Sequence, residues 1–475
     1  MSQLLILPVI LPAVLAGCIV LFARKALNVQ RAIAVLGSLA LLVLAILLNQ
    51  VPTQAYFLGH WPAPFGIPLV LDGLSALMLL LTASLALIVL IHSIATGWDA
   101  KGRHFHALYL FQLMGLNGAF LTGDAFNLFV FFEVLLIASY GLMVHGAGAA
   151  RIRAGVQYVA FNLLGSTLFL FALATIYSTT GTLNMADLAQ KLPEIPANDT
   201  ALIRVAAVLL MLVFAIKAAL VPLQFWLPGT YANAPGPVAA LFAVMTKVGA
   251  YALIRFGTLV FPSDLAATTS LIADLLYPAA LATIALGTLG TLGTRNLPRQ
   301  IAFAAIGSMG TLLLAVSAFT PQAIAAALYY LIHSTLATAA LFLIADLSRS
   351  RRDGLTAALY MAAAIAMAGM PPLSGFVGKL LILDALPGDA LAWTVILLAS
   401  LLTMIGLARQ GSDLFWKAPL TAAPPQSKAA VLLCLAALAA LTIAAGPVAD
   451  RLALTAEALH QPTAYIAANH LGGRE

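Results

Sequence analysis

The chain has 475 residues, of which 62% are hydrophobic and only 8% are charged. In soluble globular proteins about a quarter of the residues are charged. This composition therefore excludes a soluble fold and indicates an all-α, multi-pass membrane protein. The net charge of +6 does not indicate a nucleic-acid partner, because the basic residues are spread over short connections.

Apolar segments long enough to cross a bilayer recur along the whole chain and predict about fourteen transmembrane helices. They fall at residues 3–22, 32–50, 69–95, 107–122, 125–145, 156–178, 203–221, 236–257, 268–293, 300–318, 322–345, 355–386, 390–408 and 427–447. The first has no basic region before it and is followed by Arg24 and Lys25, so we expect an uncleaved span rather than a signal peptide. The boundary between the spans at 268–293 and 300–318 is defined less sharply than the other boundaries.

Basic residues predict the orientation of these spans. Most of the 23 lysines and arginines lie in alternate connections, on one side of the membrane. Under the positive-inside rule that side faces the cytoplasm, so we expect both termini on the outer side. No hydrophilic stretch is long enough for a separate soluble domain. After residue 447 we expect an amphipathic surface segment around 448–459.

The fifth span contains a carboxylate, Glu133, nine residues after Asp124. A rise of 1.5 Å per residue puts Glu133 ~14 Å deep, near the middle of the bilayer, where it cannot reach the headgroups. Ionisable residues at this depth usually belong to a transport pathway, so we expect a functional role. The alternative is a static buried ion pair that only fixes packing.

Two lysines lie in apolar segments on either side of a proline-rich break that begins at Pro222. Counted from Arg204, Lys217 lies ~20 Å into a ~30 Å core, and Lys247 lies ~15 Å from the helix start at Pro237. Snorkelling to the headgroups is the alternative, and it fits Lys217 better than Lys247. A charge beside a broken helix, where water can satisfy freed backbone groups, indicates an ion path.

Glu133 and Lys217 are expected to form a pair that changes during transport. Burial disfavours both charged forms, whereas contact between a carboxylate and an ammonium favours both. An element that makes and breaks this contact would change the proton affinity of Lys217 and pass its proton on to Lys247.

A second interruption lies in the twelfth span, at Pro371 and Pro372, with Lys379 seven residues beyond. Paired interrupted helices in corresponding halves indicate an inverted-repeat transporter. We therefore expect two five-helix repeats of opposite topology, each with one broken helix as its fourth member. The expected units are a three-helix segment (1–106), a first repeat (107–257), a second repeat (258–410) and a last helix with a short tail (411–475).

The second repeat offers Lys379 no carboxylate in the middle of a neighbouring span, and Asp384 is the nearest acid, as a shallow partner. The candidates for a polar bridge between Lys247 and Lys379 are Ser308, His333, Ser334, Thr335 and Thr338. His333 can titrate near neutral pH, but a structural hydrogen bond explains it equally well.

The other polar residues of the spans have structural explanations. We expect Asp72 to cap the helix of the third span, and Tyr158 and Asn162 to form interhelical hydrogen bonds. We expect a group of histidines near the cytoplasmic ends to be solvated: His92, His104, His106 and His145. Cys18 and Cys434 lie in apolar runs and offer neither a disulfide framework nor a metal-ligand cluster.

Three stretches, 126–140, 217–228 and 371–379, resemble one family of membrane subunits. Over nearly its whole length the chain is similar to the antiporter-like subunits shared by respiratory complex I, membrane-bound hydrogenases and the multisubunit Mrp-type cation/proton antiporters. These stretches are most similar to the D subunits of the Mrp type.

This resemblance implies roles for the buried ionisable residues. Glu133 and Lys217 match the family's essential pair, Lys247 its central relay lysine and Lys379 its terminal lysine. The resemblance also implies assembly with other membrane subunits in a bacterial inner membrane, with both termini on the periplasmic side.

The chain departs from some relatives at Gln224, where many complex I subunits have histidine, and at Thr338, where some relatives have lysine. The second departure means that the middle of the path would need hydroxyl groups or water. No long lateral helix is expected after the fourteenth span, which argues against the largest complex I subunit of this type.

The prediction is a non-enzymatic transporter subunit that relays protons in a complex exchanging them for Na⁺ or K⁺. The sequence contains no nucleotide-binding motif and implies no cofactor, so the proton gradient would supply the energy. It contains no recognisable cation cage of several converging oxygens. One alternative is a proton-pumping subunit coupled to a redox arm, of the complex I or hydrogenase type. Another is a scaffold subunit whose buried charges only fix packing.

Overall fold

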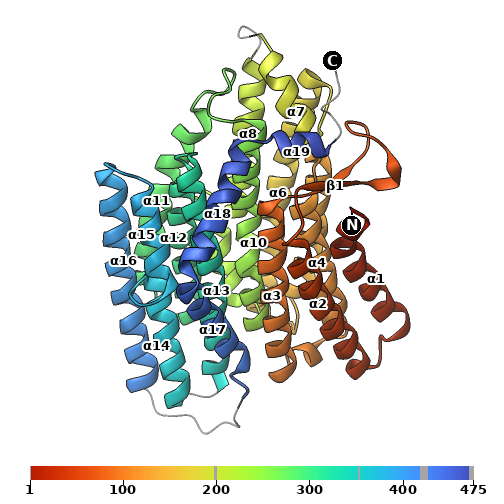
Figure 1. Cartoon of the computed structure of the whole chain (residues 1–475). Helices are drawn as coiled ribbons and strands as arrows, with labels where there is room; N and C mark the ends of the chain where they lie inside the picture. The colour runs from red at the N-terminus through yellow and green to blue at the C-terminus, as the bar shows by residue number, and fades with distance from the viewer. Residues whose placement is uncertain (1, 197–199, 351–352, 418–425, 470–475) are drawn as a thin grey trace.

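Helices make up most of the described residues in the computed structural model, which covers residues 2–196, 200–350, 353–417 and 426–469. Figure 1 shows a bundle in which long helices run roughly side by side. The N-terminal helices are η1 (Ser2–Ile6), α1 (Leu7–Phe22), α2 (Leu27–Leu48), α3 (Gly73–Ala95) and the short η3 (Trp98–Lys101). The C-terminal helices are α17 (Ala429–Ile443), α18 (Ala445–His460) and α19 (Thr463–Ala468).

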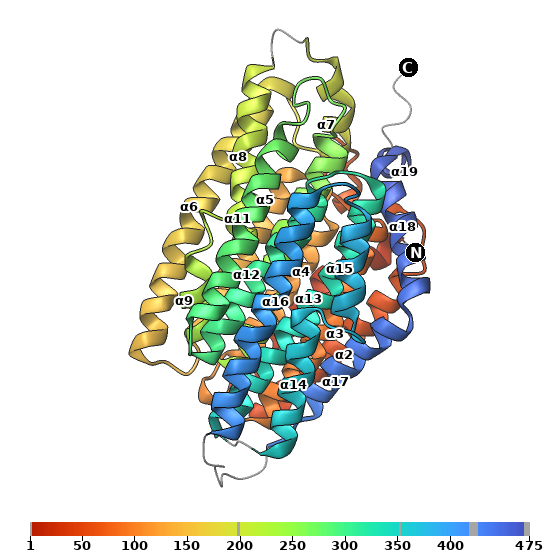
Figure 2. The same cartoon turned by 90° about the vertical axis from the view of Figure 1, so that its left-hand side faces the viewer.

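Two groups of helices lie between these ends. The first group is α4 (Phe105–Leu121), α5 (Ala125–Met143), α6 (Ala149–Thr180), the short α7 (Met185–Lys191), α8 (Ala201–Ala218), α9 (Trp226–Asn233) and α10 (Gly236–Arg255). The second group is α11 (Leu271–Gly293), α12 (Leu297–Val316), α13 (Pro321–Ser350), α14 (Gly354–Ala368), α15 (Ser374–Asp384) and α16 (Ala390–Gly411). In Figure 2, α14, α15 and α16 form the near face, and α6 and α8 run along the left edge.

Within the described ranges, eleven helices are long and apolar enough to cross a membrane, and the bent pair α17 and α18 makes a twelfth candidate. Two of the expected fourteen spans are not among these candidates. They correspond to α4 and α14, which are apolar but have only 17 and 15 residues. The expected boundary within 268–318 lies at the short connection between α11 and α12.

α10 and α13 form the centre of the bundle. In their most apolar windows, 100% of α10 and 94% of α13 is buried, and the two helices pack against each other. Small residues let α10 approach its neighbours closely. A Cβ added to Gly249 would lie 2.6 Å from the Ala218 nitrogen and 2.7 Å from the Phe214 oxygen, so glycine brings α10 against the end of α8.

Both helix breaks lie where the prolines predicted them. α8 stops at Ala218, Ala219 is left-handed with φ 55°, and the helix resumes at Trp226. α14 stops at Ala368, Gly369 has φ 77°, and α15 begins at Ser374. Each break contains a cis peptide, before Pro222 and before Pro372. Proline has no backbone donor, so neither helix continues through its break unchanged.

The structure contains a small antiparallel β-hairpin that the all-α prediction does not include. Strand β1 (Gln54–Phe57) pairs with β2 (Pro68–Leu71), with Gln54 opposite Leu71. The expected third span began at residue 69, whereas the helix begins at Gly73 because Asp72 caps it. The strand residues are as apolar as a helix, and sequence periodicity does not separate such short runs.

The expected amphipathic segment near the C-terminus corresponds to α18, which follows α17 after a bend of 80°. Leu452, Ala456 and Leu459 are buried on it, at spacings of four and three that define one face. α18 packs against α13, and Figure 1 shows it crossing the bundle obliquely.

Candidate functional site

The predicted lysines and the glutamate lie on four helices and differ in burial. Lys217 in the last turn of α8 is 8% exposed, and Lys247 in the middle of α10 is 2% exposed. Glu133 on α5 and Lys379 on α15 are half-buried. Only α10 therefore holds its lysine in the fully enclosed centre of the bundle.

Lys217 and Glu133, which are expected to make and break a contact, are not in direct contact in this structure. The Lys217 ammonium donates to Asn162 Oδ1 at 2.9 Å, and the Ser166 hydroxyl donates to Glu133 Oε1. Asn162 and Ser166 are one turn apart on α6, and the Ser166 hydroxyl is also 3.0 Å from the Asn162 carbonyl oxygen. A polar turn of α6 therefore lies between the two charged groups.

Sequence reasoning misses Ser166 and predicts only an interhelical hydrogen bond for Asn162. The available signal was the spacing of Tyr158, Asn162 and Ser166, which repeats every four residues and puts all three on one helix face. Tyr158 forms the expected interhelical bond, with 2.9 Å between its hydroxyl and that of Ser139.

A cavity of ≈ 20 Å³ lies beside Lys217, which is room for about one water molecule. Its lining includes Asn162, Tyr158 and Trp226. The Trp226 indole donates to the Ile216 carbonyl at 3.0 Å, which satisfies a backbone acceptor at the end of the interrupted helix. The Phe132 ring lies on another side of Lys217, with its centroid 5.9 Å from the ammonium. This break thus places a lysine beside both a polar acceptor and a space large enough for water.

The surroundings of Lys247 are almost apolar. Its ammonium lies 2.9 Å from the Met309 sulfur on α12, and a thioether is only a weak acceptor. Lys247 is therefore held at the centre without a carboxylate within ion-pair distance in the described part of the chain.

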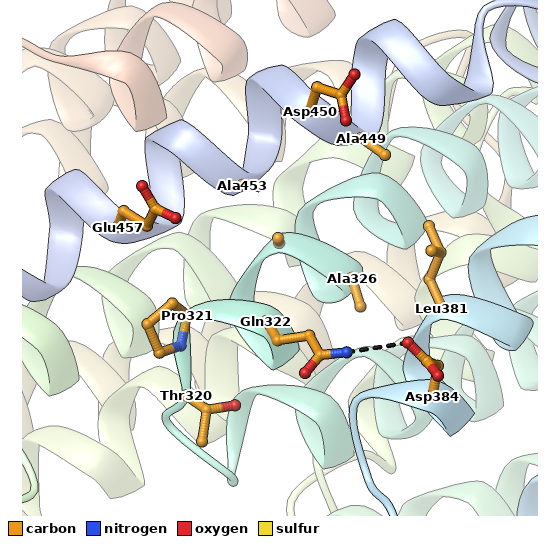
Figure 3. Close-up of a pocket in the computed structure, with 11 residues that line it drawn as sticks. Thr320, Pro321, Gln322, Ala326, Leu381, Asp384, Ala449, Asp450, Ala453 and Glu457 are labelled. Carbon is orange, nitrogen blue, oxygen red and sulfur yellow. Dashed lines mark hydrogen bonds between the residues drawn. The ribbon is translucent and has the colours of Figure 1, made fainter.

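Lys379 binds neutral oxygens. Its ammonium donates to the Ala368 carbonyl at 2.8 Å and to the Ser400 hydroxyl at 2.7 Å. The carbonyl belongs to the last residue of α14, so the break itself supplies an acceptor. The predicted contact with Asp384 is wrong, because five helical residues turn the two side chains ~140° apart. Asp384 instead accepts from Gln322 at 2.9 Å, as Figure 3 shows.

The predicted polar bridge is brought together only in part. Ser308 lines a second cavity of ≈ 20 Å³ together with Lys379, Thr311 and Tyr330. His333 Nδ1 lies 2.9 Å from the Ser374 hydroxyl, which joins α13 to the start of α15.

The other bridge candidates lie on α13, and within the described residues no hydrogen bond or cavity lining joins them to the second break. The hydroxyls of Ser334 and Thr335 both donate to the Leu331 carbonyl of their own helix, and Thr338 is buried on the same helix. Ser308 and His333 are therefore the candidates that the structure places next to the second break.

Asp72 caps α3 as predicted and also holds a buried arginine. Its carboxylate accepts the Ser75 backbone N–H at 2.9 Å, and Arg255 donates to its two oxygens at 2.6 and 2.8 Å. Burial alone would raise the pKa of Asp72, but the Arg255 guanidinium holds it below its ordinary value. Among the described residues Asp124 has no basic partner, and burial raises its pKa to about 6 although the Asn127 N–H opposes the shift. The caps of α3 and α5 thus differ in proton affinity.

The prediction of solvated histidines is wrong for three of the four. His92 and His106 are buried and lie 3.1 Å from Asp346 and Asp99, respectively. His145 is buried against the Trp98 carbonyl at 2.8 Å, and burial lowers its pKa. Only His104 is exposed.

The partners of these histidines come from connections and helices far away in sequence. Trp98 also donates to both oxygens of Asp346, at 3.0 and 2.9 Å, so α3, η3 and α13 meet at one buried carboxylate. Such a cluster gives no local sequence signal.

An open pocket of ≈ 540 Å³ lies at the opposite end of the bundle, between α18 and the ends of α13 and α15. Figure 3 shows Asp450 and Glu457 of α18 on one side and Asp384 with Gln322 on the other. Among the described residues, no group of three or more His, Cys, Asp or Glu side chains has the geometry to hold a metal ion.

Comparisons with known proteins agree on one family. Residues 122–406 match the model of the family described as NADH:quinone oxidoreductase/Mrp antiporter, TM. The chain is 38% identical to the D subunit of a probable K(+)/H(+) antiporter of Rhizobium meliloti (strain 1021), covering 98% of this chain and 97% of that protein. It is 37% identical to the D subunit of the Na(+)/H(+) antiporter of Bacillus subtilis (strain 168), covering 98% and 99%.

A solved structure has the same fold. A chain of the Mrp complex from Dietzia sp. DQ12-45-1b superposes with a TM-score of 0.89 at 28% identity, covering 99% of this chain and 100% of that chain.

Proposed function

The chain belongs to the NADH:quinone oxidoreductase/Mrp antiporter family of transmembrane proteins, and we propose that it is a D-type, proton-translocating member of a multisubunit antiporter that exchanges protons for Na⁺ or K⁺. Its partners are other membrane subunits of the complex. It acts as a transporter component and not as an enzyme.

One observation supports this function most strongly. Each helix break holds a lysine beside a polar acceptor and a small cavity, and a third lysine lies between them in the enclosed centre of the bundle. Buried lysines at membrane depth are costly, and polar groups beside broken helices are typical of transport paths. The proposed relay consists of Glu133, Lys217, Lys247 and Lys379, with Ser308 and His333 near its last step.

The geometry changes the mechanism expected for the first step. Glu133 and Lys217 are connected through Ser166 and Asn162, so a shift of α6 would alter the hydrogen bonds of both charged groups together. When Lys217 loses Asn162 as its acceptor, its ammonium is less stable and its proton passes towards Lys247. Water in the cavity beside Lys217 would complete the contact.

The finer architecture is part of the proposal. We propose fourteen spans, with α4 and α14 included and each broken helix counted once. α4 to α10 and α11 to α16 then form two inverted repeats, between a three-helix N-terminal segment and a last helix. The excess of basic residues on one side supports termini on the periplasmic side of a bacterial inner membrane.

The test is transport by the complete complex with Lys217→Ala. The gene cluster is expressed in cells without other antiporters, and everted vesicles are given a pH gradient. We expect addition of Na⁺ or K⁺ to dissipate the gradient with the intact chain but not with the variant. The matched control is Lys191→Ala, which removes a lysine paired with Asp187 outside the spans. Assembly is measured for each complex in parallel.

Other outcomes identify the alternatives. If Lys217→Ala and Glu133→Gln assemble and transport at the intact rate, the buried charges are packing elements and the chain is a scaffold. If the intact complex itself shows no cation response, a subunit coupled to a redox arm becomes the better explanation.

A further inference from the structure

An open pocket of ≈ 820 Å³ lies where the α1–α2 turn meets the connection between α3 and α4. Four of its lining side chains are basic and exposed: Arg24, Lys25, Lys101 and Arg103. They come from two connections separated by more than seventy residues in sequence, so the fold gathers them rather than a local run.

The single carboxylate that lines this pocket is already occupied. Asp99 accepts from Arg31 at 2.6 and 3.0 Å and lies 3.1 Å from His106 Nε2. Burial alone would raise the pKa of Asp99, but its hydrogen bonds to Arg31 and His106 hold the pKa below the ordinary value. Asp99 therefore does not neutralise the four basic groups, and none of them forms an ion pair within the described ranges.

The backbone around the basic groups is fixed by side chains behind it. The Gln30 amide donates to the Ala23 carbonyl at 3.0 Å and to the Arg24 carbonyl at 3.1 Å, which closes the α1–α2 turn. The Lys101 ammonium lies 3.4 Å from the centroid of the Trp98 ring, a cation–π contact that holds this side chain at the pocket wall. The positive charge is thus formed before any ligand binds.

Apolar side chains flank the same pocket on the membrane side. Leu21 and Phe22, in the last turn of α1, are 74% and 84% exposed, and Val29 at the start of α2 is 48% exposed. Figure 1 shows the end of α1, the start of α2 and the end of α3 at the same lower edge of the bundle. A positively charged pocket beside exposed apolar residues matches a molecule with an anionic head and hydrocarbon tails.

We propose that this pocket binds the phosphate headgroup of an anionic phospholipid of the cytoplasmic leaflet, with its acyl chains along the exposed ends of α1 and α2. The basic residues are on the predicted cytoplasmic side, where anionic lipids attract them. This proposal depends on the membrane placement of the chain and not on its transport activity.

The test compares lipid binding by purified complexes. The complex with the intact chain, with Arg24→Gln and Arg103→Gln together, or with the control Arg295→Gln and Arg299→Gln is bound to fluorescent phosphatidylglycerol in detergent. The control removes two exposed basic residues on the same predicted side: Arg295 in the α11–α12 connection and Arg299 in the first turn of α12. We expect the pocket variant to bind roughly 25-fold more weakly and the control to bind normally, since each of the two basic groups near an anionic surface contributes about fivefold.

Three outcomes would overturn the proposal. Equal binding by all three complexes would mean that the basic residues only set the topology. Competition by inorganic phosphate as effective as competition by phosphatidylglycerol would identify a free phosphate site. Loss of a neighbouring subunit from the pocket variant, instead of loss of lipid, would identify a protein interface.

A measurement on the intact complex keeps the proposal testable if the variant does not assemble. Phosphatidylglycerol that the intact complex retains through purification is quantified by mass spectrometry. The Kd for binding of phosphatidylglycerol to the complex is then compared with the Kd for phosphatidylcholine. We expect at least about tenfold preference for phosphatidylglycerol that weakens as salt increases. No preference between the two lipids would also contradict the proposal.

Discussion

The two broken helices stabilise their lysines in different ways. Before the first break, Lys217 donates to a side-chain amide on α6, and the same helix binds Glu133 one turn away. After the second break, Lys379 donates to a backbone carbonyl freed by the break and to the Ser400 hydroxyl. The first lysine is thus linked to a carboxylate through a neighbouring helix, and the second is bound by neutral oxygens.

In the proposed relay, this difference would separate the group that controls proton movement from the group that receives the proton. A group whose acceptor lies on another helix responds to movement of that helix. A lysine whose acceptor is a backbone carbonyl of its own broken helix keeps that acceptor as long as the broken segment keeps its conformation. We infer that the first half of the molecule sets when a proton moves and that the second half provides a constant destination.

The largest effect is expected when the second lysine is given a carboxylate. Ser400→Asp would place a negative charge within hydrogen-bond distance of Lys379 and hold its proton in a buried ion pair. We expect cation-dependent proton release in everted vesicles to fall at least ~30-fold, which corresponds to about 2 kcal/mol. Ser400→Asn has nearly the same shape without the charge, so a similar loss with Asn would assign the effect to packing.

Removing the acceptor of the first lysine should have the next largest effect. Asn162→Ala leaves the Lys217 ammonium without its side-chain partner, and an unsatisfied buried group costs about 1–3 kcal/mol. We expect antiport to fall ~10-fold in the same vesicles. Asn117→Ala is the control, because it removes a buried interhelical bond to the Pro8 carbonyl. Equal losses in both variants would show a general packing defect.

The second break should also be sensitive to a single methyl group. A Cβ at Gly369 would lie 2.7–2.9 Å from the Lys379 side chain, in a residue with φ 77°. Gly369→Ala should reduce antiport ~5-fold, because left-handed alanine costs about 1–2 kcal/mol and the lysine must move. Gly388→Ala is the control: φ is 79°, and its Cβ would contact nothing within 4 Å. A matching loss of transport in Gly388→Ala would attribute the effect to strain alone.

The smallest effect is expected for loss of one neutral acceptor. Ser400→Ala leaves Lys379 bonded to the Ala368 carbonyl, so the cost is that of one hydrogen bond, about 0.5–1.5 kcal/mol. We expect antiport to fall ~3-fold, less than for Asn162→Ala. Thr394→Ala on the same helix is the control, since its exposed hydroxyl bonds only to α16 itself. A loss larger than that of Asn162→Ala would reverse the assigned roles of the two breaks.

The breaks and the buried lysines could be predicted because their causes are local. Proline removes a donor wherever it occurs, and a lysine inside a long apolar run is costly in lipid, so its side chain is expected to face the bundle interior. The Asp72 cap followed from its position before an apolar run, and the structure confirms it.

The partners of the charged residues could not be predicted, because they depend on which faces of the helices meet. α5 is apolar on all sides, so its sequence does not indicate that Glu133 lies near the exposed stripe of Phe126, Val130 and Ile137. The sequence contains the spacing of Asn162 and Ser166, but it does not indicate which helices this face contacts. The buried histidines depend on carboxylates contributed by η3 and α13 in the same way.

The two central helices are anchored at opposite ends by buried charges. Arg255 fixes the C-terminal end of α10 to Asp72 at the start of α3, and Asp346 fixes the C-terminal part of α13 to His92 and Trp98. Neither helix can slide along its axis without separating one of these pairs. We infer that the centre is a rigid frame, and that protons cross it by rotation of side chains and water rather than by rocking of whole helices. A covalent cross-link between α3 and α10 beside Arg255 should therefore leave the rate of transport unchanged, whereas a rocking bundle would stop.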